Sequence, residues 1–535
     1  MPDTPSCETV TTRLVEPRIV PRLIVNGCRF VRSIRRDVMN TAADVSGAGQ
    51  HLRSLPERYR CDTGGVDPSF GEWDVIVVGA GTAGCVVAER LSRDPAVRVL
   101  LIESGPDGPT ASADLFAALS APGRLWPDVR ARRSPLGPVR VYPRGRGIGG
   151  SSAVNGLLDL RPTGGDLDRW ASVGLALDTS VQRTVAQLPT SKWGPADRAL
   201  AMAGHAAGLP LVRRARVDQA GIGAAPLHAR FDVDRQLLRA STDVTHLGPA
   251  RQRPNLAVLP DTDVIELTGA ATGAVGGVRA ETANGPRTIS APLTVVCAGS
   301  IHTPALLLRS GLARPGIGRN LADHAAIGVT LHLRGPAPAA TPTTCALGHT
   351  AGGLQLLPLN RLGTTDELRM LGGLLIGVLD NRGRGSVSID EAGRPVPEFD
   401  LLGDPHDRAE IVRATRLLFD IASRPEVRAE ATHVSIDERG TPLADAIGMD
   451  DRTLTRWIEQ NLADYVHATG TCAFGSSEDP SAVVGPGGVV HGTTGVAVID
   501  ASVFPTPPRV NPWRATVMLA SALADDLAAL QGGYR

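Results

Sequence analysis

The feature that most constrains the fold of this chain is a glycine-rich turn set between two short apolar runs. Residues 74–78 are rich in valine and isoleucine, which suits a strand buried on both faces of a parallel sheet. Residues 85–91 have the apolar spacing of an amphipathic helix, and 98–103 form a second apolar run. Together these segments predict a βαβ unit whose turn matches Gly-x-Gly-x-x-Gly.

Each glycine in such a turn has a separate task. The first allows the sharp turn after the strand, the second lets the backbone approach a pyrophosphate, and the third lets the helix pack closely on the strand. The helix N-terminus then offers N–H donors and a positive dipole to phosphates. The residues expected to contact a dinucleotide here are Gly79, Gly81, Thr82, Ala83 and Gly84. Glu103, at the end of the second strand, is expected to accept hydrogen bonds from a ribose diol, which favours NAD or FAD over NADP.

The charge balance and cysteine usage exclude several classes of partner. Lys plus Arg and Asp plus Glu each total 55, so no overall field favours nucleic acid or an anionic membrane. The 7 cysteines show no Cys-x-x-Cys spacing, so we expect neither a disulfide framework nor a metal site, and we predict a cytoplasmic location. No apolar run is long enough to predict a membrane span, and Arg35-Arg36 lacks the hydrophobic run of an export signal.

Apolar strand-like runs recur in widely separated parts of the chain. They lie at 257–267, 294–299 and 496–500, and 514–530 has the pattern of a final helix. We therefore predict a discontinuous, doubly wound α/β domain for the cofactor. Its expected segments are 72–160, 250–325 and 465–535.

The segments between these pieces are expected to build a second domain over the site. We predict an α+β substrate domain with an antiparallel sheet from residues 161–249 and 326–464, including a strand at 386–389 and a helix at 407–422. Residues 1–70 lack a clear period, and we interpret them as a loosely ordered N-terminal extension with a short helix near 31–39.

A second glycine-rich loop covers residues 144–156. An NAD enzyme needs no such loop, whereas a flavin enzyme needs backbone N–H groups and small side chains beside its isoalloxazine ring. The loop therefore favours FAD. The residues expected to contact the cofactor here are Arg146, Gly149, Gly150, Ser151 and Asn155.

Several elements, in order along the chain, resemble signatures of the glucose–methanol–choline (GMC) oxidoreductase family. They are residues 145–155, 299–312, 318–324, 381–387 and 499–505. One departure is Ala313, where the family usually has glycine. The resemblance spans residues 72–530 and implies FAD and oxidation of an alcohol carbon.

His467 lies in His-Ala-Thr-Gly-Thr-Cys, which is similar to the element that carries the family's catalytic histidine. An imidazole can take the hydroxyl proton as a hydride passes to flavin N5. The family places a His or Asn before the last helix, so Asn511 is the candidate to hydrogen-bond the substrate oxygen. In another register Trp513 takes that place and the usual partner is missing. The remaining histidines considered are interpreted as structural: His302, His324 and His491.

The resemblance also implies further cofactor contacts. Asp500 and Ala501 are expected to line the flavin, and Val264 to present its backbone to the adenine. Val154 stands near the position where some relatives carry a flavin-linking histidine, so we expect FAD to bind without a covalent bond.

The sequence thus predicts an FAD-dependent enzyme that oxidises a small-molecule alcohol to a carbonyl. A dehydrogenase is favoured over an oxidase, because a cytoplasmic enzyme gains nothing obvious from making peroxide; the electron acceptor is left open among oxygen, a quinone and another redox carrier. Three alternatives remain: a lyase of the hydroxynitrile type on the same scaffold, a non-redox flavin-binding protein with Trp513 blocking the site, and an NAD dehydrogenase.

Overall fold

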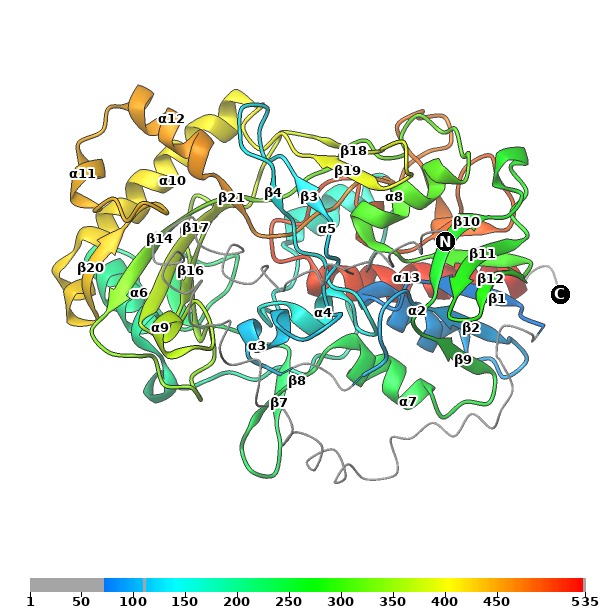
Figure 1. The fold of residues 1–535 in the computed structure, drawn as a ribbon, viewed down its shortest axis with the longest axis horizontal. Coiled ribbons are helices and arrows are strands. Elements are labelled where there is room, and N and C mark those ends of the chain that lie inside the picture. The colour runs from blue at the N-terminus through cyan, green and yellow to red at the C-terminus, as the bar shows by residue number, and fades with distance from the viewer. Residues whose placement is uncertain (1–71, 109–111, 533–535) are drawn as a thin grey trace, which may run out of the picture.

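The computed structural model describes residues 72–108 and 112–532 (Figure 1). The helix expected near 31–39 lies outside these residues. Within them, no helix is both long and apolar enough to cross a membrane.

A five-stranded parallel sheet forms the core of one half of the molecule. Its neighbouring strands all pair in parallel, which confirms the predicted βαβ unit. The strands, in spatial order, are β22 (Val496–Val498), β13 (Leu293–Val296), β1 (Val75–Val78), β2 (Val99–Ile102) and β9 (Leu256–Leu259). Because they come from three separated parts of the chain, residues far apart in sequence meet at one edge of this sheet.

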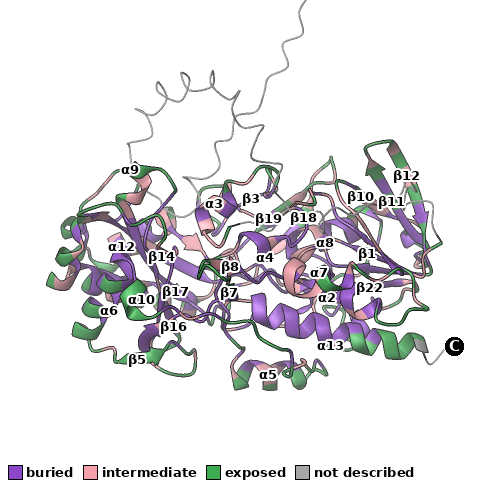
Figure 2. Ribbon diagram, turned by 90° about the horizontal axis from the view of Figure 1, so that it is seen from below, coloured by how far each residue is buried: buried purple, intermediate pink, exposed green. Residues whose placement is uncertain are grey.

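Helices α2 (Thr82–Leu91) and α13 (Trp513–Gly532) lie side by side beneath this sheet (Figure 2). Most of α13 is buried, and only its C-terminal turns reach solvent. Helix α8 (Gly299–Arg309) follows β13, and an antiparallel sheet of β10 (Asp263–Leu267), β11 (Gly277–Thr282) and β12 (Gly285–Ser290) packs nearby. The start of α13 and the start of α2 therefore both belong to the half that carries the glycine-rich turn.

An eight-stranded sheet forms the core of the other half. All of its pairs are antiparallel except β5 with β6. Its strands are β20 (Ala431–Ser435), β14 (Ala325–Leu333), β17 (Leu371–Val378), β16 (Leu354–Leu359), β15 (Ala346–His349), β6 (Gly221–Ala224) and β5 (Leu211–Arg214), with β21 (Ala463–Asp464) paired to β14. Helices α6 (Pro195–Ala206) and α10 (Pro405–Ser423) pack on one face of the sheet and on each other.

The fold is thus a doubly wound α/β half joined to a half with a mainly antiparallel sheet, as the sequence predicted. The smaller helices are α3 (Leu115–Leu119), α4 (Ser151–Val154), α5 (Gly164–Ala171), α7 (Gly248–Ala250), α9 (Asp366–Arg369), α11 (Ala444–Ile447) and α12 (Asp451–Asn461). The short hairpins are β3 (Arg130–Ala131) with β4 (Arg140–Val141), and β7 (Ala229–Phe231) with β8 (Leu237–Arg239). The exact domain boundaries stay a prediction.

One predicted strand lies in a sheet separate from the large antiparallel sheet. Residues 386–389 are a strand, β18 (Ser386–Ile389), but it pairs with β19 (Pro395–Glu398) in a sheet of its own and contacts α8. The cause is its backbone bonding, since Val387 N donates to the carbonyl of Gly318 and Gly385 forms a bridge with Leu321. The predicted strand is therefore confirmed, and it lies in a sheet separate from the large antiparallel sheet; its assignment to the substrate domain stays a prediction.

Candidate active site

A pocket lies between the two halves, at the carboxyl ends of the parallel strands. Gly79 follows β1, Glu103 follows β2, Ala298 follows β13, and all three line the pocket wall. Parallel α/β sheets bind ligands at this edge because the loops there diverge. On the opposite wall stand Leu357 and Leu375, from β16 and β17 of the antiparallel sheet.

The two glycine-rich loops touch each other at one end of this pocket. Gly149 N donates to the carbonyl of Ala80 over 2.8 Å. A Cβ atom on Gly150 would stand only 2.7 Å from Gly81 Cα, and Gly150 has a φ of +48°. The two backbones can approach this closely only because Gly150 lacks a side chain.

The chain leaves room for a phosphate group where α2 begins. Gly81 is the N-cap of α2 and carries no side chain to bond the first N–H groups of the helix. A Cβ on Gly81 would meet nothing within 4 Å, although Gly81, Thr82 and Ala83 all line the pocket. At Gly84, by contrast, a Cβ would lie 1.8 Å from the carbonyl oxygen of Gly79. This combination of an uncapped helix terminus and an open cradle fits a dinucleotide pyrophosphate.

Glu103 binds the two glycine-rich loops together. Its buried carboxylate accepts hydrogen bonds from the backbone N–H groups of Ala80, Gly105 and Gly147, at 2.8, 3.0 and 2.8 Å. A carboxylate has about four lone-pair sites, so about one stays available to a ribose hydroxyl. The sequence predicted the ribose contact, which stays a prediction, and missed this clamping of the loops.

Most of the predicted cofactor contacts lie on the pocket wall. They are Gly79, Gly81, Thr82, Ala83, Glu103, Gly150, Ser151, Asn155, Asp500 and Ala501. Four others stand behind it: Gly84, Arg146, Gly149 and Val264. Gly84 and Gly149 shape the loops as described above.

The other two groups behind the wall are held by neighbouring residues. Arg146 donates to the carbonyl of Ser104, and its guanidinium lies over the ring of Trp126. The carbonyl of Val264 accepts from Arg309. The predicted contact of Val264 with an adenine ring therefore has a competitor within the chain.

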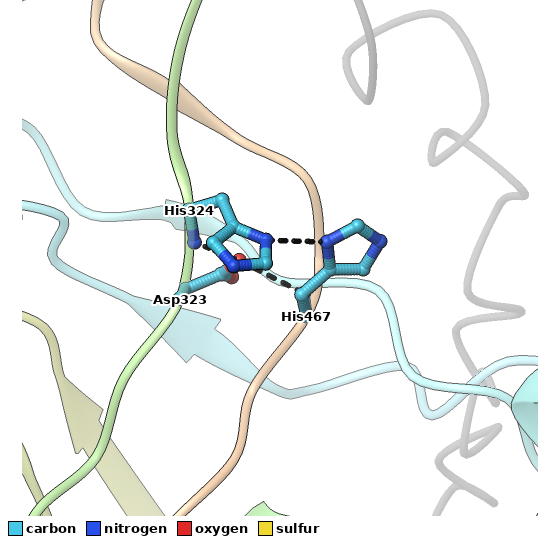
Figure 3. A group of neighbouring side chains, drawn as sticks. All are labelled: Asp323, His324 and His467. Atoms are coloured by element: carbon cyan, nitrogen blue, oxygen red, sulfur yellow. Dashed lines mark hydrogen bonds between the residues drawn. The ribbon is translucent and has the colours of Figure 1, made fainter. Parts of the chain in front are cut away.

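His467 stands at the opposite end of the pocket and is held there through its backbone. Its N–H donates to Asp323 Oδ1 over 2.9 Å (Figure 3). Val466, the preceding residue, has a φ of +59°, a strained conformation for a β-branched side chain. Such strain persists only where the surroundings fix it, and it concentrates at functional sites.

His324 also contacts His467. Its Nδ1 lies 2.9 Å from Nδ1 of His467, and Figure 3 shows the two rings edge to edge. Its Nε2 lies 3.1 Å from the carbonyl oxygen of Pro508, which can only accept, so Nε2 carries the hydrogen. Burial lowers the pKa of His324 to about 4, so the ring is neutral and its Nδ1 is an acceptor.

These contacts fix the tautomer of His467. Burial, the neighbouring His324 and Arg144 hold the pKa of His467 well below its usual value, so this ring is neutral as well. Its Nδ1 carries the hydrogen that His324 accepts, so its Nε2 carries no hydrogen and has a lone pair that can accept one. Because His467 lines the pocket, this tautomer is the one a proton acceptor needs.

Asn511 lies directly beside that lone pair. Its Nδ2 donates to His467 Nε2 over 3.2 Å, and its Oδ1 accepts from Gln355 Nε2 over 3.1 Å. Gln355 also donates to His349 Nε2 on the neighbouring strand. The bond from Gln355 to Asn511 Oδ1 orients the amide of Asn511 so that its Nδ2 points toward His467.

Trp513 lines the same pocket but makes different contacts. Its ring stacks on His228 with centroids 3.9 Å apart and an angle of 11° between the planes. Of the two residues that the sequence left as alternatives for the second polar position, the structure brings Asn511 to His467.

Asp323 supports this end of the pocket from behind. Tyr142 donates its hydroxyl hydrogen to Asp323 Oδ2 over 2.6 Å and accepts from Ala468 N. Burial raises the pKa of Asp323 to about 7, while these hydrogen bonds act to lower it. The side chains of Asp323, His324 and His467 are close enough to hold a metal ion. Their facing atoms already bond one another or backbone N–H groups, so we assign them a hydrogen-bonding role.

Sequence reasoning missed two histidines at this pocket. His324, interpreted as structural, contacts His467, and His302 lines the pocket and stacks on Trp126 with centroids 4.2 Å apart. The Asp-His pair that ends the element 318–324 was the available signal for His324, whereas His302 had none. His491 bonds the carbonyl of Gly475 away from the pocket.

Two sequence profiles of the GMC oxidoreductases match this chain, over residues 73–326 and 381–520. A GMC-type oxidoreductase of Rhodococcus erythropolis is 31% identical over 84% of this chain and 96% of its own length. This chain belongs to the GMC oxidoreductase family. It is also 28% identical to a 5-(hydroxymethyl)furfural oxidase of Methylovorus and 27% identical to an oxygen-dependent choline dehydrogenase of Chromohalobacter salexigens, over 85% of the chain and 98% and 94% of theirs.

Solved structures agree on the fold. Pyridoxine 4-oxidase from Mesorbium loti superposes with a TM-score of 0.73 at 24% identity, over 87% of this chain and 100% of its own. A formate oxidase also gives 0.73, at 18% identity, over 87% of this chain and 99% of its own. The cofactor of this family member is FAD, which the paired glycine loops and the uncapped start of α2 fit. The NAD dehydrogenase alternative is therefore wrong.

Proposed function

We propose that this GMC oxidoreductase oxidises a small-molecule alcohol to a carbonyl, with His467 as the general base. The observation that carries the proposal is the tautomer of His467, whose Nε2 carries no hydrogen and accepts from Asn511 Nδ2 at the pocket wall. FAD, when bound, supplies the acceptor for the hydride that leaves the alcohol carbon.

The proton is handled by this chain's own residues. His467 Nε2 accepts the hydroxyl hydrogen, and the positive charge that forms on the ring is shared through Nδ1 with His324. The carbonyl of Pro508 holds His324 in the accepting tautomer. His324 is therefore a positioning residue, because it acts on the alcohol only through His467.

Asn511 positions the substrate oxygen. In the free pocket its Nδ2–H points at His467 Nε2, so an oxygen that enters between the two atoms can donate to the histidine and accept from the amide. Gln355 keeps the amide in that orientation by donating to Asn511 Oδ1. The alcohol oxygen is thus held while its hydrogen is removed.

The relatives named for 5-(hydroxymethyl)furfural and choline support an alcohol as the substrate class. We retain dehydrogenase over oxidase as our prediction, together with non-covalent binding of FAD, because Val154 cannot form the histidine link seen in some relatives. Oxygen uptake during turnover would contradict the assignment as a dehydrogenase. Flavin that stays with the denatured protein would contradict non-covalent binding of FAD.

The test is the visible spectrum of the purified protein before and after anaerobic addition of a panel of alcohols. We expect bands of oxidised flavin that bleach with at least one alcohol, with one carbonyl product formed per flavin bleached. A yellow protein that splits a hydroxynitrile and is bleached by no alcohol would favour the lyase. A yellow protein inert to both would favour the non-redox alternative.

A further inference from the structure

The end of the pocket that holds His467 carries an excess of positive charge. The charged residues that line the whole pocket are Glu103, Arg133, Arg140, Arg144, Asp464 and Asp500. Glu103 lies at the glycine loops, and Asp500 is bonded by Gly299 N, Thr303 and Ser502 N beside the parallel sheet. Three arginines and one aspartate are left around the wall of the antiparallel sheet.

One of these arginines is largely engaged within the chain. Arg133 is buried and forms an ion pair with Asp464 at 2.5 Å. It also donates to the carbonyls of Ala131, Arg140 and Val141. Arg133 and Asp464 therefore neutralise each other and hold the hairpin of β3 and β4 in place.

The other two arginines have donors to spare. Arg140 donates to the carbonyls of Leu462 and Gln460, and Arg144 donates to the carbonyl of Val466. Neither guanidinium has a carboxylate within 4.0 Å among residues 72–108 and 112–532. A guanidinium offers five N–H donors, so both groups keep donors for an anion, and Arg144 is bonded to Val466, the residue before His467.

The surroundings of Arg140 and Arg144 strengthen the attraction of their guanidinium groups for an anion. Arg140 and Arg144 are only partly exposed, and the facing wall is apolar, with Leu357, Leu359 and Leu375. Arg144 also contributes to the lowered pKa of both His467 and His302, after the larger effect of burial. A guanidinium bound mainly to carbonyl oxygens in such a place attracts anions more strongly than one on the open surface.

We propose that the alcohol substrate carries a carboxylate, which Arg140 and Arg144 bind while its apolar body lies on the leucine wall. The inference rests on the proposed alcohol oxidation and names the substrate class. A carboxylate accepts two parallel hydrogen bonds from a guanidinium, so it also orients the alcohol end toward His467. A cationic alcohol is disfavoured at this end of the pocket.

Binding can be tested without turnover. Trp126 and Trp513 line the pocket, so quenching of tryptophan fluorescence in the FAD-loaded protein reports on occupancy. We expect benzoate to bind about tenfold more tightly than benzamide, which corresponds to one charge-assisted contact, and its affinity to fall as salt is added. Equal affinities, or tighter binding of the amide, would overturn the proposal even if alcohols bleach the flavin.

Turnover uses three alcohols of the same size: 4-(hydroxymethyl)benzoate, its amide, and the trimethylammonium analogue of the acid. Stopped-flow bleaching should be fastest for the acid at low concentration and slowest for the cation. If the amide is bleached and the acid is not, the proposed function stands and this inference fails. If no alcohol bleaches the flavin while benzoate still binds preferentially, the proposed function fails instead.

Substitutions of the two arginines test whether they bind the substrate carboxylate or only support the pocket. Arg144→Gln and Arg140→Gln should each reduce the ratio of the acid rate to the amide rate toward one. Arg213→Gln, on the exposed strand β5, is the matched control and should leave the preference intact. A preference that survives both pocket substitutions would overturn the assignment. A slower rate for acid and amide alike would show that Arg144 acts on the flavin rather than on a carboxylate.

Discussion

The two ends of the pocket consist of different chemical groups. The end at the parallel sheet is made of backbone and glycine, with Gly150 packed against Gly81 and Glu103 clamping both loops. The end at the antiparallel sheet is made of buried polar side chains, with His467 bonded by His324 and Asn511. The first end is suited to hold a large cofactor, and the second to move a proton.

The difference teaches how each end depends on the chain. The glycine end is set by two short contiguous motifs, so a single added methyl group should disturb it. The polar end joins residues from three separate segments, which lie before β14, within β16 and before α13. Its chemistry therefore depends on how these segments are oriented relative to one another. Substitutions at the two ends should therefore fail in different ways.

The largest effect is expected at His467. His467→Ala should slow anaerobic flavin bleaching by an alcohol by about 10²–10⁴-fold, the usual contribution of a general base. The FAD content should not change, because the glycine end is untouched. Stopped-flow absorbance measures the rate, and His205→Ala, at an exposed position on α6, is the control. Loss of less than tenfold would contradict the role of His467.

A methyl group at the glycine end should give the opposite result. Gly81→Ala places a Cβ where no atom of the chain stands within 4 Å, so the protein should fold normally. FAD should bind about ten- to a hundredfold more weakly, because the methyl occupies space next to the start of α2. Fluorescence titration of the apoprotein measures this.

Gly164→Ala is the matched control, since its Cβ also meets nothing within 4 Å but Gly164 lies outside the pocket wall. Unchanged FAD affinity in Gly81→Ala would show that the cofactor does not approach the start of α2.

A smaller effect separates the two candidates for the second polar position. Asn511→Ala removes a donor to the substrate oxygen and should slow bleaching about tenfold, the value of one hydrogen bond. Trp513→Phe keeps a ring stacked on His228 and should change the rate by less than about twofold. If Trp513→Phe costs more than Asn511→Ala, the register with Trp513 is the functional one.

The smallest expected effect is that of pH. Protonated His467 cannot accept a proton, so the bleaching rate falls as pH drops through its pKa. Because burial holds that pKa well below its usual value, titration of His467 should change the rate little between pH 8 and about pH 6. Burial raises the pKa of Asp323 to about 7, so stopped-flow measurements across this range use the Asp323→Asn variant as well as the native protein. A decline centred near the ordinary histidine pKa of about 6.5 in both proteins would contradict the buried, neutral ring.

The sequence predicted the glycine end well because its signals are local. The buried strand before Gly79, the helix after Gly84 and the acid at position 103 lie within one βαβ unit, where periodicity is informative. Motifs that resemble the family also singled out His467 and Asn511, which the structure brings into contact; their catalytic roles stay predictions.

The polar end was harder to predict because its contacts join residues far apart in sequence. Gln355 lies 156 residues from Asn511, and His324 lies 143 residues from His467. Nothing in the local sequence around Gln355 distinguishes it from an ordinary polar residue in a strand. The strand at 386–389 was predicted, but its separation from the large antiparallel sheet was not, since its contacts are with Gly318 and Leu321, over 60 residues earlier.

The central claim is that the alcohol's C–H bond breaks at this pocket while His467 takes the hydroxyl proton. The most direct test is single-turnover, anaerobic flavin bleaching with an alcohol and with the same alcohol carrying deuterium on the carbinol carbon. We predict slower bleaching with the deuterated alcohol, and retention of that isotope effect in the slower His467→Ala variant. Equal bleaching rates with the two alcohols, or no bleaching with any alcohol, would contradict hydride removal at this site. Equal bleaching rates in the native protein and the His467→Ala variant would contradict the role of His467.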